Sequence, residues 1–378
     1  YPCFCSSAEL DAATVEGRDG REVRHYPGTC RGLDPAERAR RLGRRMPHVV
    51  RFAVPDGVTD IDIEDEVFGD IAFSASDIDD FIIRRADGRA TYNFAVVVDD
   101  VDMRISHVIR GVGHLSNTPK QALLFDALGA ARPRFAHLPT VLGPEGRKLS
   151  KREGASSVAE LRALGYPASA VLNYVSLLGW SHPEEREVLS AEELIASISL
   201  DRVGRSDAHM DPDKLLWVSA RHVARETLPE LTAHVAPFLD HGAVPVPDDR
   251  LPLVVDALRS RLSTYGEIRE HLPILFPEET DELDAARRAA ASAPGSADVL
   301  AAVAHALAEA APWEDEALGR AVRDAGSRLG ARGASLFHPV RQALIGTSRG
   351  PDLGKILAAI GRDEALRRIR ASLDGNPV

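Results

Sequence analysis

The pattern of apolar and polar positions divides the chain into a strand-rich first part and a helical second part. Between residues 49 and 100, short runs alternate apolar with polar residues. A period of two is typical of strands with one buried face. The Asp87-Gly88 pair also predicts a tight hairpin between the last two runs. We therefore predict five strands, at Val49–Val54, Asp60–Asp65, Asp70–Phe73, Phe81–Arg85 and Ala90–Val98.

A strand-helix-strand unit follows in the sequence. Its strands are predicted at Ile105–Arg110 and Arg134–Leu142. Between them, Ser116-Asn117-Thr118-Pro119 places capping residues and a proline at the start of a helix that Gly129 ends. Such units build parallel sheets whose ligands lie at the carboxyl ends of the strands. The loop after Leu142 leaves from such an end.

From Ser156 onward the apolar spacing becomes helical. Proline and glycine delimit three predicted helices, at Ser157–Leu164, Pro167–Leu178 and Pro212–Arg225. The last part of the chain is rich in Ala, Leu, Arg and Glu, and its turn-forming segments are Ser292–Ser296, Ala311–Trp313 and Gly346–Pro351. This pattern predicts a helical bundle.

Composition sets the class of protein. With 378 residues and 44% apolar content, the chain can bury a large core in two or three domains. It has no apolar run of about 18 residues, so we expect a cytoplasmic protein without a membrane partner. The net charge of the chain is −11, yet the segment from Arg18 to Arg51 contains ten arginines and only four acidic residues. That patch is either the solvated face of a helix around Pro35–Arg45 or a contact for nucleic-acid phosphate.

Lysine is rare in this chain and concentrated in one loop. Only five of the 46 basic residues are lysines, and two of them lie in the pentapeptide Lys148–Arg152. An ammonium on a flexible stem is suited to contact phosphate as a movable point charge. Gly143, Pro144 and Gly146 precede it as a turn that could let the loop close. The pentapeptide is therefore a candidate phosphate clamp, with a solvated basic loop as the alternative.

Three cysteines give a candidate metal site. Cys3 and Cys5 are followed by Cys30, with His25 and Tyr26 just before it. In a reducing compartment such thiols favour a metal over a disulfide. Structural zinc takes four ligands, so Tyr26 or His25 would have to supply the fourth. Three reduced cysteines without a metal remain the alternative.

Together these motifs resemble those of bacterial glutamyl-tRNA synthetase, a class I aminoacyl-tRNA synthetase. The resemblance covers most of the chain and follows the order of the family. The matching blocks are Tyr1-Pro-Cys-Phe-Cys5, Tyr26-Pro-Gly-Thr-Cys-Arg31, Thr91-Tyr-Asn-Phe-Ala-Val-Val-Val-Asp-Asp100, His107-Val-Ile-Arg-Gly111, His114-Leu-Ser-Asn-Thr-Pro119, Arg134-Phe-Ala-His-Leu-Pro139, Lys148-Leu-Ser-Lys-Arg152, Leu172-Asn-Tyr174, Leu178-Gly-Trp-Ser181, Asp213-Lys-Leu-Leu-Trp217 and Leu336-Phe-His-Pro-Val-Arg341.

The resemblance implies roles for individual residues. It identifies Lys148–Arg152 with the mobile ATP loop, so that Lys148, Ser150, Lys151 and Arg152 are catalytic and Lys151 contacts the triphosphate together with His114. ATP would be bound with Mg²⁺. Tyr92 and Arg110 match positions that line the glutamate pocket, and an arginine fork suits a carboxylate. A buried structural arginine is the alternative for Arg110.

The resemblance also implies an α/β plus all-α fold with four segments. They are an acceptor-stem-binding insertion at 1–90 with the zinc candidates Cys3, Cys5, Cys30 and Tyr26, the second half of a Rossmann-like nucleotide fold at 91–155, a stem-contact helical region at 156–225 and a helical anticodon-binding domain at 226–378. The implied function is glutamate–tRNA ligase, with tRNA(Glu), ATP and glutamate as partners, and we expect a monomer.

The sequence departs from the family in three places. The first half of the nucleotide fold is missing with its His-Ile-Gly-His signature, and the chain begins at Tyr1, so we expect that it was cut from a longer protein and forms no adenylate alone. Gly111-Val112-Gly113-His114 is a decoy for that signature. Val112 and Gly113 stand where the family has acids, and Gly32 where zinc-bearing relatives have histidine.

These departures leave two alternatives to the glutamate enzyme. One is a tRNA-binding fragment or paralogue without catalysis, which Val112 and Gly113 favour. The other is a relative that charges glutamine or mischarges its tRNA.

Overall fold

The computed structural model describes residues 1–16, 22–24, 26–147, 157–239, 246–247 and 249–374. The chain forms two compact units. The first comprises Tyr1–Lys148, Leu178–Glu185 and Ser197–Met210, and the second comprises Leu149–Leu177, Arg186–Ala196 and Asp211–Val378. Lys148, Ser150, Lys151, Arg152 and His25 lie outside the described residues.

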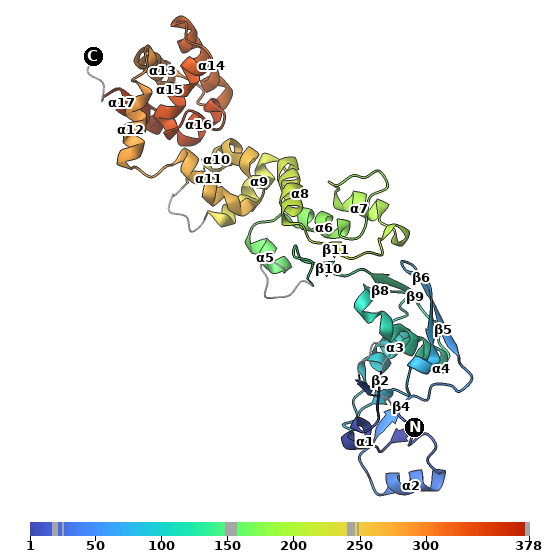
Figure 1. Cartoon of the computed structure of the whole chain (residues 1–378). Helices are drawn as coiled ribbons and strands as arrows, with labels where there is room; N and C mark the ends of the chain where they lie inside the picture. Colours follow the sequence, from blue (N-terminus) through green and yellow to red (C-terminus); the bar gives the residue numbers. More distant parts are fainter. Residues whose placement is uncertain (17–21, 25, 148–156, 240–245, 248, 375–378) are drawn as a thin grey trace. The chain divides into compact units, whose positions relative to one another are not determined.

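A four-stranded sheet is the centre of the first unit (Figure 1). In spatial order its strands are β6 (Gly69–Ser74), β5 (Asp60–Asp65), β9 (Arg134–Leu138) and β8 (His107–Gly111). The predicted alternation of β5 is confirmed, because its residues are exposed and buried in strict turn. β8 and β9 pair in parallel, with His107 opposite Arg134, which confirms the predicted strand-helix-strand unit.

Three smaller sheets complete the strands of this unit. β1 (Pro2–Cys3) and β7 (Ile82–Arg84) flank β4 (Val49–Arg51), so that the cysteine motif is tied to a sheet. The other two sheets are pairs, β2 (Thr14–Glu16) with β3 (Glu22–Arg24) and β10 (Val141–Leu142) with β11 (Ala208–His209). The short helices of the unit are α1 (Ser7–Asp11), α2 (Pro35–Gly43), η1 (Ala75–Asp77), η2 (Val112–Asn117) and η3 (Leu200–Arg202).

The predicted strand at Ala90–Val98 is wrong. The Asp87-Gly88 turn does form, with Gly88 at a φ of 85°, but only Ala90 bridges back to the preceding strand. The chain then enters helix α3 (Tyr92–Asp102). Its valine run favours a strand in isolation. Phe94, Val97 and Val101 are spaced by three and four residues, however, and a helix brings all three to the core.

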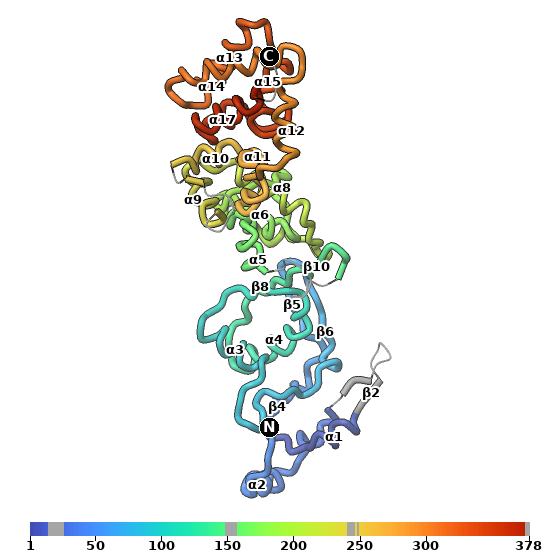
Figure 2. The backbone as a smooth tube through the Cα atoms, turned by 90° about the vertical axis from the view of Figure 1, so that its left-hand side faces the viewer, coloured from blue at the N-terminus to red at the C-terminus, as the bar shows by residue number. Residues whose placement is uncertain are grey.

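Helix α4 (Thr118–Ala127) packs against α3 and β5 in both views (Figures 1 and 2). It begins with a proline in its first turn, as predicted, and Gly129 follows its end at a φ of 65°. The Asn117 side chain, however, makes no capping hydrogen bond. The core between sheet and helices contains Ile61, Ile63, Val97, Leu123, Leu124, Phe125 and Phe135. This core fixes the carboxyl end of β8 next to the start of α3.

The second unit is helical. Its predicted helices are confirmed within a residue or two, and Pro212–Arg225 is confirmed with the same limits. The helices are α5 (Val158–Ala163), α6 (Ala168–Leu177), α7 (Ala191–Ser197), α8 (Pro212–Arg225), α9 (Leu228–Val235), α10 (Leu251–Leu258), α11 (Ile268–Leu275), α12 (Asp281–Ala290), α13 (Ser296–Glu309), α14 (Asp315–Arg328), α15 (Ala334–Ile345), α16 (Leu353–Ile360) and α17 (Arg362–Leu373), with short turns η4 (Ala236–Phe238), η5 (Arg259–Arg261) and η6 (Tyr265–Glu267).

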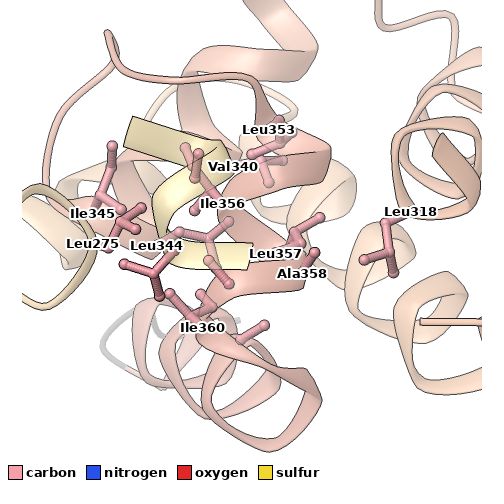
Figure 3. Packing of buried hydrophobic residues seen from close by; sticks show 14 of the residues in the cluster. Leu275, Leu318, Val340, Leu344, Ile345, Leu353, Ile356, Leu357, Ala358 and Ile360 are labelled. Carbon is pink, nitrogen blue, oxygen red and sulfur yellow. The ribbon is translucent and has the colours of Figure 1, made fainter. Parts of the chain in front are cut away.

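One apolar core joins the helices from α8 to α17. Figure 3 shows Leu275 of α11 beside Leu344 and Ile345 of α15, with Ile356 and Leu357 of α16 next to them. The predicted turn segments fall between helices, except that Ser296 is the first residue of α13. Among the described helices, none is long and apolar enough to cross a membrane.

Candidate active site

Three of the predicted site residues come together at the carboxyl end of β8. Arg110 is on β8, His114 is on the η2 turn that follows, and Tyr92 is the first residue of α3. The rings of Tyr92 and His114 are 6.1 Å apart between centroids. Tyr92 is 53% exposed, so it is available to a ligand.

Arg110 is held from behind by two neighbours. Its Nε donates to Nε2 of His137 at 3.1 Å, and its Nη2 donates to Oγ1 of Thr118 at 2.8 Å. Burial lowers the pKa of the guanidinium, while Tyr92 and Asp100 act in the opposite direction. Arginine stays charged even so, because its ordinary pKa lies far above neutral pH. Both bonds engage the Nε–Nη2 edge of the guanidinium.

Behind Arg110 lies a buried, hydrogen-bonded pair of side chains. Nδ1 of His137 is 2.6 Å from Oδ2 of Asp65, and both side chains are 0% exposed. Oδ1 of Asp65 also accepts the backbone N–H groups of Val67 and Phe68, at 3.0 and 2.9 Å. Burial alone would raise the pKa of Asp65, but these hydrogen bonds hold it below its usual range. Asp65 is therefore a carboxylate at neutral pH.

Sequence analysis missed Asp65, Thr118 and His137 as site residues. Signals exist for two of the three: Asp65 ends an alternating strand at a buried position, and His137 interrupts the apolar strand β9. A buried polar residue within an apolar strand requires a partner. Neither signal identifies the partner, which is 72 residues away in the sequence.

The turn that precedes the predicted ATP loop belongs to the described residues. Gly143–Arg147 forms a turn in which the N–H of Gly143 donates to the carbonyl of Arg147 at 2.7 Å, and Gly146 has a φ of 73°. This confirms the turn predicted before Lys148. Nothing in the described part of the chain bears on the predicted roles of Lys148, Ser150, Lys151 and Arg152.

The three cysteines converge in the first unit, although they come from two segments. The sulfur atoms of Cys3, Cys5 and Cys30 all lie within 4.8 Å of one another. Cys5 Sγ and Cys30 Sγ are 3.6 Å apart, close to the roughly 3.8 Å that two sulfurs of a tetrahedral zinc site require. Three thiols at this spacing fit a zinc ion.

Tyr26 lies beside this cluster and is buried. Its hydroxyl oxygen accepts the N–H of Cys30 at 3.0 Å, and the Arg51 guanidinium stacks 3.8 Å from its ring. Burial raises the pKa of the Cys3 thiol, but hydrogen bonds, first of all from Arg51, lower it overall. Burial and Cys30 raise the pKa of Cys5 to about 12. A bound cation would lower the pKa of Cys5 again, because the thiolate is the form of cysteine that binds metal.

The chain matches two family models along most of its length. Residues 1–217 match the catalytic domain of class I tRNA synthetases (E and Q), and residues 230–373 match an anticodon binding domain. Their order agrees with the strand-rich and helical parts of the chain.

Similar proteins cover nearly the whole chain. A glutamate–tRNA ligase from Desulforudis audaxviator is 39% identical over 377 residues, or 98% of this chain and 75% of that protein. Glutamate–tRNA ligase 1 from Alkalilimnicola ehrlichii is 40% identical, over 99% of this chain and 78% of that protein.

A solved structure agrees with these sequence matches. The glutamate tRNA ligase from Elizabethkingia meningosepticum, in complex with its amino acid, superposes with a TM-score of 0.82 at 26% identity and covers 99% of this chain and 79% of that chain. The expected fold class is thereby confirmed, and the paralogue and glutamine alternatives are not favoured. The chain belongs to the glutamate and glutamine family of class I tRNA synthetases.

Proposed function

We propose that the protein is a glutamate–tRNA ligase, which activates glutamate with ATP to glutamyl-adenylate and transfers it to tRNA(Glu). One observation carries this proposal: ligases of that name are similar to the chain over 98 to 99% of its length. The expected cofactor requirement follows from the same family, with ATP bound as its Mg²⁺ complex.

We assign glutamate binding to Arg110 and Tyr92. The Nη1 atom and the second N–H of Nη2 present a fork that can hold both oxygens of a carboxylate. Tyr92 adds an exposed hydroxyl beside that fork. Because the guanidinium is already held by His137 and Thr118, little side-chain entropy is lost when substrate binds.

For ATP, the proposed residues remain His114 and the loop Lys148–Arg152. Attack of the glutamate carboxylate on the α-phosphate places negative charge on the departing pyrophosphate. A cation that reaches those oxygens lowers the barrier because the charge grows in the transition state. We assign that task to Lys151, supported by Lys148, Ser150 and Arg152.

We further propose that Cys3, Cys5 and Cys30 bind a structural zinc ion, with the Tyr26 hydroxyl as the fourth ligand. The convergence of the sulfurs supports this. The ion would crosslink β1 to the segment before α2. That segment belongs to the proposed acceptor-stem-binding region, residues 1–90.

For tRNA, we propose that α2 contacts backbone phosphates through its arginines. Arg40 on α2 and Arg44 and Arg45 just after its end are exposed, while Glu37 forms ion pairs with both Arg40 and Arg41, at 2.5 and 2.7 Å. Arginine contacts of this kind position RNA without reading its sequence. Residues 156–225 would contact the stem, and 226–378 the anticodon.

The test is aminoacylation by the full-length enzyme, with radiolabelled glutamate and glutamine offered separately on tRNA(Glu) and tRNA(Gln). We expect glutamate to be attached to tRNA(Glu). Charging with glutamine, or no charging with either amino acid, would contradict the proposal.

A further inference from the structure

We propose that Asp65 and His137 are positioning residues for Arg110: they hold its guanidinium in one orientation and thereby set the affinity for the amino-acid carboxylate. This inference rests on the proposed function, in which Arg110 binds glutamate. Both residues act through Arg110, because their side chains are 0% exposed.

The geometry forms a continuous chain of hydrogen bonds across three elements. Asp65 ends β5, His137 lies in β9 and Arg110 lies in β8, so neighbouring strands of one sheet carry all three. The distances are 2.6 Å from Asp65 to His137 and 3.1 Å from His137 to Arg110. Because the strands are fixed by ladder hydrogen bonds, the side chains have a rigid base.

The position of the imidazole proton follows from these contacts. Asp65 is ionised and can only accept, so the proton between the pair belongs to Nδ1 of His137. Nε2 of the neutral ring then has a lone pair, which faces the Nε–H of Arg110 at 3.1 Å and Oγ1 of Thr118 at 3.2 Å. Burial and the nearby charge of Arg110 lower the pKa of His137, whereas the contact with Asp65 raises it. The net result is a pKa below the usual value for histidine. The ring is therefore neutral at pH 7.

The opposite tautomer would disrupt Arg110. A proton on Nε2 would face the Nε–H of Arg110, and two donors cannot share a hydrogen bond. Asp65 prevents this by accepting from Nδ1. Thr118 supplies a second anchor, since its Oγ1 accepts from Nη2 at 2.8 Å. The guanidinium is thus fixed along its Nε–Nη2 edge, and its Nη1 end is left for the substrate carboxylate.

Three variants of the full-length enzyme test this relay. His137→Leu removes the acceptor, His137→Gln offers an amide oxygen near the place of Nε2, and Asp65→Asn turns an amide N–H₂ toward Nδ1 and so favours the wrong tautomer. The matched control is His222→Leu, because His222 is also buried but bonds to Asn173 in the helical unit. Each is assayed by aminoacylation for kcat and for the KM of glutamate and of ATP.

We expect His137→Leu and Asp65→Asn to raise the KM for glutamate about tenfold or more while the KM for ATP stays within about twofold. His137→Gln should recover most of the loss, and His222→Leu should leave the KM for glutamate unchanged even though it lowers Tm. A uniform change in both KM values, or an unchanged glutamate KM in Asp65→Asn, would overturn the proposal. If His137→Leu does not fold, the contrast between His137→Gln and Asp65→Asn decides.

Nitrogen NMR of histidine-labelled protein provides a readout that packing alone would not change. We expect the proton of His137 on Nδ1 in the wild type and on Nε2 in Asp65→Asn. A wild-type proton on Nε2 would overturn the relay. If the wild-type enzyme does not charge tRNA with glutamate, the proposed function fails; if it does and the glutamate KM is insensitive to His137, only this inference fails.

Discussion

Nδ1 of His137 lies 2.6 Å from Oδ2 of Asp65 in the interior of the first unit, although 72 residues separate them in the sequence. The backbones of β5 and β9 pair at one registered position, Asp65 opposite Phe135. The hydrogen bond between Asp65 and His137 adds a side-chain link between the same two strands. The protonation state of this pair therefore matters for the stability of the sheet as well as for Arg110.

The first prediction concerns acid pH. The folded state lowers the pKa of His137 from its ordinary 6.5. Just below pH 6.5, His137 is therefore protonated in the unfolded chain but still neutral in the folded chain. The free energy of unfolding consequently falls as the pH drops below about 6.5, by up to roughly 1.4 kcal/mol per pH unit for one such group. Urea unfolding between pH 7 and 5 measures this slope. His137→Gln should reduce this slope, to which buried His222 also contributes, whereas His305→Gln, at a side chain 74% exposed, should leave it unchanged.

Zinc gives the second prediction. Protein purified without chelator should contain close to one zinc per chain, and Cys5→Ser should lose most of it because one thiolate ligand is removed. Elemental analysis with thiol titration checks both. The proposal fails if zinc is near zero and all three thiols titrate freely.

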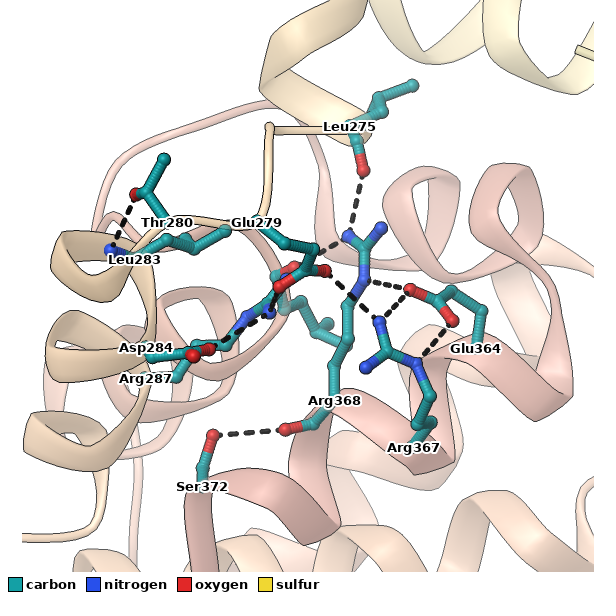
Figure 4. Close-up of polar contacts among 11 residues, drawn as sticks. Leu275, Glu279, Thr280, Leu283, Asp284, Arg287, Glu364, Arg367, Arg368 and Ser372 are labelled. Atoms are coloured by element: carbon teal, nitrogen blue, oxygen red, sulfur yellow. Dashed lines mark hydrogen bonds and ion pairs between the residues drawn. The ribbon is translucent and has the colours of Figure 1, made fainter. Parts of the chain in front are cut away.

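A buried arginine in the helical unit gives the third prediction. Nη1 of Arg368 donates to the carbonyl oxygen of Leu275 at 2.8 Å and its Nε donates to Glu364 at 2.6 Å (Figure 4). The same Nη1 donates to the carbonyl oxygen of Leu344 at 2.7 Å. Arg368→Met would leave two buried carbonyls without this donor. We expect a loss of about 2 to 5 kcal/mol of stability. Calorimetry should show a clear fall in Tm.

The control for that variant is Arg370→Met in the same helix, because Arg370 is exposed. It should change stability by no more than about 0.5 kcal/mol. Equal effects of the two substitutions would mean that the Arg368 contacts contribute nothing beyond helix propensity.

The fourth prediction concerns Lys151. In the full-length enzyme, Lys151→Ala should lower the adenylation rate roughly a hundredfold or more, with a much smaller effect on the KM for glutamate, because the lysine acts on charge that develops in the transition state. ATP–pyrophosphate exchange in the presence of tRNA measures it. An unchanged rate would assign Lys148–Arg152 to a solvated basic loop.

Sequence pattern predicted the elements whose periodicity is set locally. β5 was predicted from its alternation and α8 from the proline at which it opens, and both have the predicted bounds. α3 was mispredicted because a run of valines favours a strand by local propensity, whereas packing of Phe94, Val97 and Val101 against the sheet requires a helix. Tertiary contacts outweighed propensity there.

The site was predicted only in part, for a related reason. Arg110, Tyr92 and His114 were found through motifs, but each motif is a local string. The contact from Asp65 to His137 depends on which strands pair. The strand order β6-β5-β9-β8 cannot be predicted from the local sequence of β5 or of β9. The role of His137 behind Arg110 therefore became visible only with the sheet assembled.

The most direct test of the account is the KM for glutamate of Arg110→Ala in the full-length enzyme, measured by aminoacylation of tRNA(Glu) beside the KM for ATP. Loss of a charged hydrogen-bond partner of the substrate should raise the glutamate KM roughly tenfold to a hundredfold, with the ATP value within about twofold. Lys120→Ala, on α4 outside the described contacts of Arg110, is the control and should match the wild type. A glutamate KM that is the same in Arg110→Ala and the wild type would contradict the assignment of the site.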